Sequence, residues 1–176
     1  MFAVPKMSDS DQRFNDADVS RRTEDVPTLT LFNGNNVRVL TPGQSTDQRL
    51  TVIEYVDFTL GNPPPFTRHD FIEVFSVLEG RLAFQYLDET PFYVSAGNAA
   101  TVPSGFSHTF WNPDDQPLRI MLVCTPAGLD GFFEAIHREA EKFRADQIGQ
   151  DEVSSIMAKL RIEYGVEETA AAPDID

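Results

Sequence analysis

The sequence predicts an all-β domain followed by two helices. From residue 28 to about residue 125, short runs of β-branched, aromatic and other apolar residues alternate with turn residues. Short strands at such regular spacing are typical of a sandwich or barrel and not of alternating strands and helices. After Pro126 the apolar residues recur at three- and four-residue steps, which is the period of an amphipathic helix.

Turn signals separate the predicted strands from one another. Clear examples are residues 33–36, 41–43 and 112–115. They contain Gly and Asn, which adopt positive φ easily, and Pro, which fixes φ and has no N–H donor. The predicted strands are residues 28–32, 37–40, 50–60, 71–78, 81–87, 92–94, 99–102, 107–111 and 118–125.

Two apolar stripes predict the two helices. The first stripe consists of Leu129, Phe132, Phe133, Ile136, Ala140 and Phe143, and the second of Val153, Ile156, Met157, Leu160 and Tyr164. Gly165 fits the C-terminal end of the second helix. We therefore expect a flexible N-terminal arm (1–27), a β domain (28–127), two helices that pack on it (128–165) and a disordered tail (166–176).

Charge and cysteine content exclude several classes of protein. The chain has 28 acidic and 14 basic residues, a formal charge of −14, so we expect neither nucleic acid nor an anionic membrane as a partner. Cys124 is the only cysteine, which excludes a disulfide within the chain, and its apolar surroundings predict a buried hydrophobic residue. No stretch approaches the ~20 apolar residues of a membrane-spanning helix, and the first residues turn polar too early for a secretory signal. We therefore expect a cytoplasmic protein.

A candidate functional segment runs from Gly97 to Asn112 and reads GNAATVPSGFSHTFWN. Gly97 and the turn from Pro103 to Gly105 would return the chain into the next strand, from which His108 would point into the domain. The fixed residues resemble the second sequence motif of the cupin family, G-x5-P-x-G-x2-H-x3-N, at every position.

Residues 61–80 resemble the first cupin motif, G-x5-H-x-H-x3-E-x6-G, with one departure. With the three-residue spacer, Glu73 and Gly80 keep their positions and His69 takes the second histidine position. Thr67 stands where the first histidine is expected.

The first motif also occurs with a four-residue spacer, which would place both histidine positions on Phe66 and Arg68 and lose both ligands. Strand geometry favours the three-residue spacer, because alternate side chains of a strand share one face. In an unbulged strand, Thr67, His69 and Glu73 then face inward together. The other register leaves the Glu73 carboxylate without partners in an apolar interior, which is unfavourable.

With His108, this register predicts a set of two histidines and one carboxylate. Such a set suits Fe(II), and also accepts Mn, Ni, Co or Zn, with open positions for water, oxygen or substrate. The Thr67 hydroxyl could hydrogen-bond a bound water or a substrate oxygen. In the alternative, which stays open, no metal is bound and His69 and Glu73 are only a hydrogen-bonded pair in a pocket.

Both motifs together make the chain similar to the single-domain cupins often grouped as quercetin dioxygenase-like. The resemblance implies a double-stranded β-helix, or jelly-roll barrel, here extended by the two C-terminal helices. It also implies frequent homodimers and a metal held by three histidines and one glutamate. His69, Glu73 and His108 match ligand positions of the family, whereas Thr67 departs from one.

Inward-facing aromatic residues are expected to form an apolar substrate pocket beside Thr67. These residues are Phe71, Phe75, Phe84 and Phe110, for several of which core packing is the alternative. His137 on the first predicted helix is expected on the surface or in packing. Arg68, of opposite parity to His69, is expected in solvent or at an interface.

The leading functional expectation is a metal-dependent oxygenase that acts on an aromatic or polyketide-like hydroxy-ketone, with His69, Glu73 and His108 as catalytic residues. Two alternatives stay open. One is an isomerase, cyclase or dehydratase that uses Glu73 or His69 as acid or base without O2. The other is a non-catalytic protein that binds a small molecule.

Overall fold

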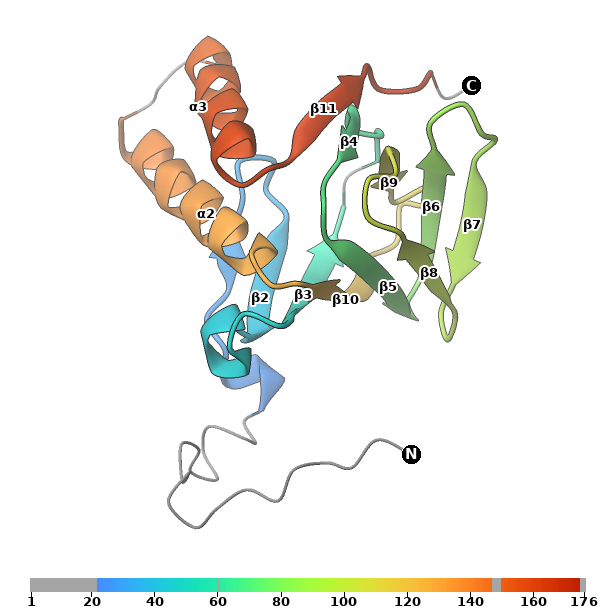
Figure 1. Cartoon of the computed structure of the whole chain (residues 1–176), viewed down its shortest axis with the longest axis horizontal. Coiled ribbons are helices and arrows are strands. Elements are labelled where there is room, and N and C mark those ends of the chain that lie inside the picture. Colours follow the sequence, from blue (N-terminus) through green and yellow to red (C-terminus); the bar gives the residue numbers. More distant parts are fainter. Residues whose placement is uncertain (1–21, 60, 147–149, 175–176) are drawn as a thin grey trace.

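The computed structural model describes residues 22–59, 61–146 and 150–174, and these form two antiparallel sheets and two helices (Figure 1). The six-stranded sheet has the order β1 (Leu29–Thr30), β2 (Asn36–Thr41), β3 (Thr51–Phe58), β10 (Leu118–Thr125), β5 (Ile72–Glu79), β8 (Ala99–Val102). The five-stranded sheet has the order β11 (Glu167–Ala170), β4 (Phe66–Arg68), β9 (His108–Trp111), β6 (Arg81–Tyr86), β7 (Phe92–Ser95). The helices are α2 (Leu129–Asp146) and α3 (Gln150–Glu163). The predicted all-β class with a two-helix extension is confirmed.

Nine strands coincide with the nine predicted runs, and two further strands do not. These are β4, which has only three residues, and β11, whose residues are mostly polar. These two strands pair with each other, with Glu167 opposite Arg68 and Ala170 opposite Phe66. The predicted disordered tail is therefore wrong for Glu167–Ala170, because pairing with β4 gives this polar segment its extended conformation.

The first motif was expected in one strand, but the structure divides it between β4, β5 and the link that joins them. β4 belongs to the five-stranded sheet and β5 to the six-stranded sheet, so residues 67 to 73 do not form the one unbulged strand that was expected. The intervening residues carry the chain from one sheet to the other. At this crossing the Gly105 N–H donates to His69 O at 2.8 Å, which ties the turn before β9 to the link.

The N-terminal arm lies largely outside the described residues. Residues 1–21 are outside them, and within the rest of the arm Thr23–Asp25 form a 3-10 helix. A second 3-10 helix, Gly43–Thr46, lies between β2 and β3. The Val26 side chain is buried, so the packed domain begins slightly before the predicted boundary.

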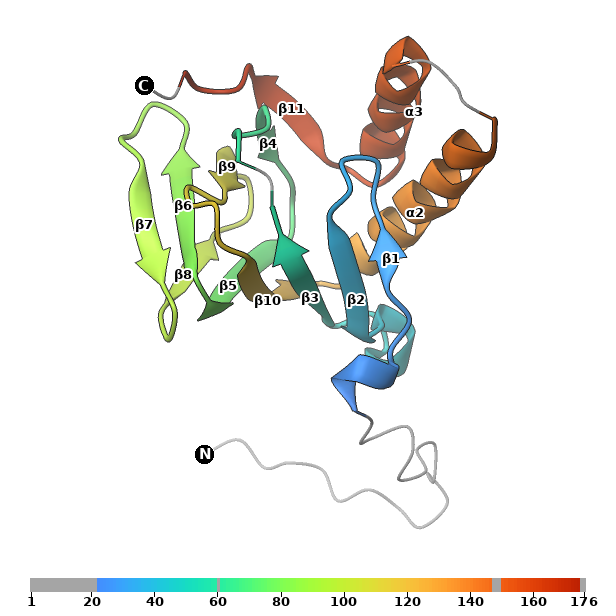
Figure 2. The ribbon, with the colours of Figure 1, turned by 180° about the vertical axis from the view of Figure 1, so that it is seen from behind.

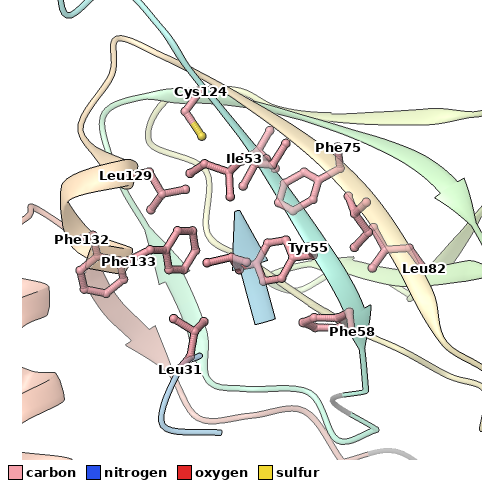
Figure 3. Packing of buried hydrophobic residues seen from close by; sticks show 14 of the residues in the cluster. Leu31, Ile53, Tyr55, Phe58, Phe75, Leu82, Cys124, Leu129, Phe132 and Phe133 are labelled. Atoms are coloured by element: carbon pink, nitrogen blue, oxygen red, sulfur yellow. The ribbon is translucent and has the colours of Figure 1, made fainter. Parts of the chain in front are cut away.

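A core of buried hydrophobic residues joins the strands to the start of α2. Leu129, Phe132 and Phe133 lie on one side of Tyr55, and Phe58 and Phe75 lie on the other (Figure 3). The same cluster contains Cys124, which is fully buried as expected.

Seen from behind, α2 and α3 lie beside β1 and β2, away from the end of the molecule that carries β6 and β7 (Figure 2). His137 of α2 packs there, with its Nδ1 3.1 Å from Thr30 N. Among the described residues, no helix is long and apolar enough to cross a membrane.

Candidate metal centre and ligand cavity

Three buried side chains from different parts of the chain meet at one carboxylate oxygen. His69 Nε2 lies 2.8 Å from Glu73 Oε2, and His108 Nε2 lies 3.1 Å from the same oxygen. All three residues are at most 5% exposed. The predicted triad is thus brought together, although by a crossing between sheets and not by one strand.

The fold holds each member of the triad from a separate element. Glu73 lies in β5, His108 begins β9, and His69 lies in the link before β5. Gly105 adopts φ +80°, which a side chain would strain, and this turn places His108 at the start of its strand. Asn112 ends the motif in a structural role, since its Nδ2 donates to Phe58 O at 2.9 Å and to Gln116 O at 2.8 Å.

Both imidazoles have an acceptor at each ring nitrogen. His69 Nδ1 lies 2.9 Å from Phe71 O, and His108 Nδ1 lies 3.1 Å from Phe106 O. A neutral imidazole has only one N–H to donate. It therefore donates either to the backbone carbonyl from Nδ1 or to Glu73 Oε2 from Nε2, and not to both. A cation bound between the Nε2 atoms and Glu73 would leave each Nδ1 hydrogen for its carbonyl.

The spacing of these atoms fits a divalent metal ion. Candidate ligand atoms of His69, Glu73 and His108 all lie within 4.8 Å of one another. Two ligands bound ~2.1 Å from an ion and at right angles to each other are ~3 Å apart. The observed distances of 2.8 and 3.1 Å agree with this value. Two imidazoles and one carboxylate could therefore hold such an ion.

The triad alters the acidity of its carboxyl group. Burial raises the pKa of Glu73, but hydrogen bonds from His108 and His69, together with their charge, outweigh it. The pKa of Glu73 therefore lies below its ordinary value of 4.5. Glu73 is a carboxylate at neutral pH, as a metal ligand must be.

Thr67 occupies the position of the absent first histidine. It is paired with His108 across β4 and β9, and both residues line the same cavity. Within the described residues, no fourth histidine, cysteine or carboxylate joins the candidate ligand group. Thr67 supplies a hydroxyl beside the site in place of an imidazole.

A cavity of about 290 Å³ opens beside the triad. Its apolar wall comes from the strands and from both helices, and its polar wall includes the triad itself. The wall residues are Leu31, Phe32, Asn33, Asn35, Tyr55, Phe58, Pro64, Thr67, His69, Glu73, His108, Phe110, Leu129, Phe132, Phe133, Ile136, Met157, Arg161 and Val166.

The predicted pocket residues divide into two groups. Thr67 and Phe110 line the cavity as expected. Phe71, Phe75 and Phe84 are not part of its wall, and the prediction is corrected for these three residues. Phe71 stacks on the His69 ring at 3.7 Å between centroids, and Phe84 stacks on His108 at 5.6 Å. Phe71 and Phe84 therefore pack on the two imidazole rings, and Phe75 packs against Phe84 and Phe110.

Tyr55 is the most informative wall residue that the sequence analysis missed. It lies in β3 on the same face as the buried Ile53, and this alternation was the signal that could have identified it. Burial, followed by the negative charge of Glu73, raises the pKa of Tyr55 well above 10.0. Its phenol is therefore a hydrogen-bond donor at the cavity wall throughout the physiological pH range.

Two arginines near the cavity have different surroundings. Arg68 is exposed and forms an ion pair with Glu167 at 2.5 Å, in line with its expected solvent-facing position. Arg161 of α3 lines the cavity and pairs with Glu168 of β11. Arg161 could not be placed from the sequence, because only the packing of α3 and β11 brings it to the cavity.

Comparisons with known proteins agree with the motifs. The cupin domain family matches residues 55–124. The polyketide cyclase RemF from Streptomyces resistomycificus is similar in structure, with a TM-score of 0.53 and 22% identity over 60% of this chain and 78% of that one. An RmlC-like cupin from Shewanella frigidimarina has a TM-score of 0.53 and 19% identity over 63% of this chain and 93% of that one.

A third similar structure is a sugar phosphate isomerase of the cupin superfamily from Silicibacter pomeroyi. Its TM-score is 0.53, with 18% identity over 62% of this chain and 76% of that one. A comparison with curated proteins finds no match. At these identities the three structures establish a common fold and carry no information about a common reaction.

Proposed function

The chain belongs to the cupin superfamily, and from this premise we propose that it is a metal-dependent enzyme acting on a small aromatic or polyketide-like hydroxy-ketone. One observation carries the proposal. The buried ligand atoms of His69, Glu73 and His108 converge at the wall of a largely apolar cavity. This combination supports a bound ion that meets a substrate oxygen while the remainder of the substrate packs against apolar side chains.

Fe(II) is the ion we propose first, because two histidines and one carboxylate with open positions form its usual oxygenase site. When bound, an ion supplies Lewis acidity toward the hydroxy-ketone oxygens, and a redox-active one also supplies the reactivity toward O2 that an oxygenase needs. The carboxylate of Glu73 and the two imidazoles hold their ligand atoms ready, since each Nδ1 is already hydrogen-bonded to a backbone carbonyl.

Two further side chains have roles in substrate binding under this proposal. The phenol of Tyr55 remains protonated and can donate a hydrogen bond to a substrate oxygen in the cavity. Phe110, together with Phe58 and Phe133, would pack against an aromatic ring and keep water away from the site. Thr67 would hydrogen-bond a second substrate oxygen beside His108.

A second candidate is a cyclase or isomerase that consumes no O2. The observation that favours it is the protonated Tyr55 phenol near the Glu73 carboxylate, because an acid and a base at one wall suit proton transfer to and from a ketone. A polyketide cyclase with the same fold is compatible with this candidate, although its low identity does not transfer the activity.

Metal analysis and oxygen uptake test the proposal together. We expect near-stoichiometric metal in protein reconstituted with Fe(II), and loss of that metal in His69→Ala and His108→Ala. His137→Ala is the matched control, because this third histidine lies on α2 and is hydrogen-bonded to Thr30. No bound metal after reconstitution would contradict the proposal.

The reaction type follows from a second measurement on the same samples. Substrate consumption coupled to O2 uptake with a flavonol or dihydroxy-aromatic panel supports an oxygenase. Substrate consumption without O2 uptake supports the cyclase or isomerase.

A further inference from the structure

The turn between β1 and β2 holds one side chain in a fixed position at the cavity wall. Leu31 N donates to Asn35 O at 2.9 Å, and Gly34 N donates to Leu31 O at 3.1 Å. Asn35 N also donates to the Asn33 side-chain oxygen at 3.1 Å. These bonds fix the backbone of Asn35, and its side-chain amide takes no part in them.

The Asn35 amide is oriented by one hydrogen bond and lacks another. Its Oδ1 accepts from the Thr59 N–H at 3.1 Å, which decides which branch of the amide is oxygen. The residue is 1% exposed, and its Nδ2 has no hydrogen-bond partner among the described residues. A buried amide nitrogen without an acceptor is unfavourable, so such a group calls for a partner outside the protein chain.

The cavity is where that partner would lie. Asn35 is part of the wall that also contains Phe58, Phe110 and the triad. Its Oδ1 is already occupied by Thr59, so Nδ2 is the polar atom of this side chain that remains for a ligand. The β1–β2 turn contributes none of the three candidate metal ligands, so Asn35 is a polar group separate from the triad in a mainly apolar wall.

We propose that Asn35 is a specificity-determining residue whose Nδ2 donates a hydrogen bond to an acceptor oxygen of the substrate. The inference rests on the proposed function, because the hydroxy-ketone end of the same substrate would face the triad. It narrows the substrate class to ring compounds with a further carbonyl or hydroxyl oxygen, separate from the two hydroxy-ketone oxygens that would face the triad. A substrate without that oxygen leaves the amide unpaired and binds less tightly.

Binding of matched probes tests this assignment. The probes are 3-hydroxychromone and its 6-hydroxy and 7-hydroxy derivatives, which add one oxygen on the far side of the ring system. We expect at least one derivative to bind metal-reconstituted wild-type protein about tenfold more tightly than the parent, measured by calorimetry without O2. In Asn35→Asp this preference should disappear, because the carboxylate keeps the acceptor for Thr59 and loses the donor.

Two further variants separate a binding role from a structural one. Asn35→Ala should also lose the preference while it binds the unsubstituted parent within about twofold of wild type. Asn36→Asp adds the same charge to the same turn and keeps its acceptor for Thr30 Oγ1, so it should retain the preference. Equal affinities of all three probes for wild-type protein, a preference unchanged in both Asn35 variants, or its loss in Asn36→Asp would each overturn the assignment.

The outcome is distinguishable from failure of the proposed function. Metal content, measured on the same samples, tests the triad. It is independent of the ratio between the affinities for the hydroxylated probes and for 3-hydroxychromone. Protein that binds metal but shows no preference retains the proposed function and loses the role of Asn35. Protein that binds no metal contradicts the proposed function, whatever the ratio.

Discussion

At the scale of single residues, the triad has more acceptors than neutral imidazoles have hydrogens. On each ring, one backbone carbonyl at Nδ1 and the shared Glu73 Oε2 at Nε2 compete for the single N–H of a neutral imidazole. A buried carboxylate among apolar groups is stable only when it is paired or bound to a cation. The three side chains could therefore hold a cation at their centre.

Thr67→His tests whether the absent ligand can be restored. The new imidazole would stand opposite His108, where cross-strand side chains are ~4.5–5.5 Å apart between Cβ atoms. We expect metal affinity to rise about tenfold or more, measured by competition with a chromophoric chelator. Thr67→Val, which removes the hydroxyl and adds no ligand, is the control and should leave the affinity unchanged. An affinity for Thr67→His no higher than that of Thr67→Val would show that position 67 does not face the ion.

Glu73→Gln tests the acidity of the carboxyl group in metal-free protein. The folded-state pKa of Glu73 is lowered from 4.5, so its carboxylate stabilises the folded state fully above pH 4.5. This contribution is lost as the pH falls below 4.5 and through the lower folded-state pKa. The difference in unfolding free energy between wild type and Glu73→Gln should therefore shrink over that window, as measured by urea unfolding with a chelator present.

The control for this measurement is Glu89→Gln, which removes one exposed carboxyl from the turn after β6. It accounts for the change in net charge that any such variant introduces. A difference between wild type and Glu73→Gln that stays constant at low pH, after this correction, would contradict the lowered pKa.

At the scale of elements, two connections decide the form of the site. The link between β4 and β5 brings His69 and Glu73 together across two sheets, where the parity rule had placed them in one strand. The alternation of side chains along a strand still favoured the three-residue spacer. A single strand and the observed crossing both bring residues 69 and 73 to the same interior. The β4–β11 pair could not be predicted locally, since the polar residues of β11 are extended only through their partner strand.

Helix α2 closes the cavity with a side chain that also belongs to the core. Phe133 is 6% exposed and packs edge-to-face on Tyr55 at 5.7 Å between ring centroids. We expect Phe133→Ala to lower the unfolding free energy by about 3–5 kcal/mol through loss of packing, measured by urea unfolding.

Ile162→Ala is the matched control for this variant. Ile162 is 84% exposed on α3, so its truncation should change the unfolding free energy by no more than about 0.5 kcal/mol. Similar losses in the two variants would show that α2 does not pack on the strands as described here.

At the scale of the whole molecule, the outer face of the six-stranded sheet is the surface we expect between two copies of the chain. Val123 of β10 lies between Val52 of β3 and Val74 of β5, all on the face opposite the core. On β5, Ile72 and Leu78 are 40% and 38% exposed. The same face also carries Glu54, which is paired with Arg38 and Arg119, so the apolar part is the strip around Val123. An exposed apolar strip on a sheet face favours self-association.

Sedimentation tests this expectation directly. We expect the wild-type protein to sediment with twice the mass of one chain, and Val123→Glu to sediment as a monomer, because the charge falls in the centre of the apolar face. Phe106→Glu makes the same kind of change at a residue that is 55% exposed and packs on Tyr86 of the other sheet, so it should remain dimeric. A monomeric wild-type protein would contradict the expectation.

The sequence by itself determined the fold class, most strand positions and the identity of the three candidate ligands. The fold class and the strand positions follow from local causes, which are hydrophobic period and turn residues, whereas the three candidate ligands follow from the resemblance of residues 61–80 and 97–112 to the two cupin motifs. The tertiary structure alone decided that Phe71 and Phe84 support the imidazole rings, and that Tyr55 and Asn35 stand at the cavity wall. Such assignments depend on which distant segments pack against each other, and periodicity along one segment carries no information about its neighbours.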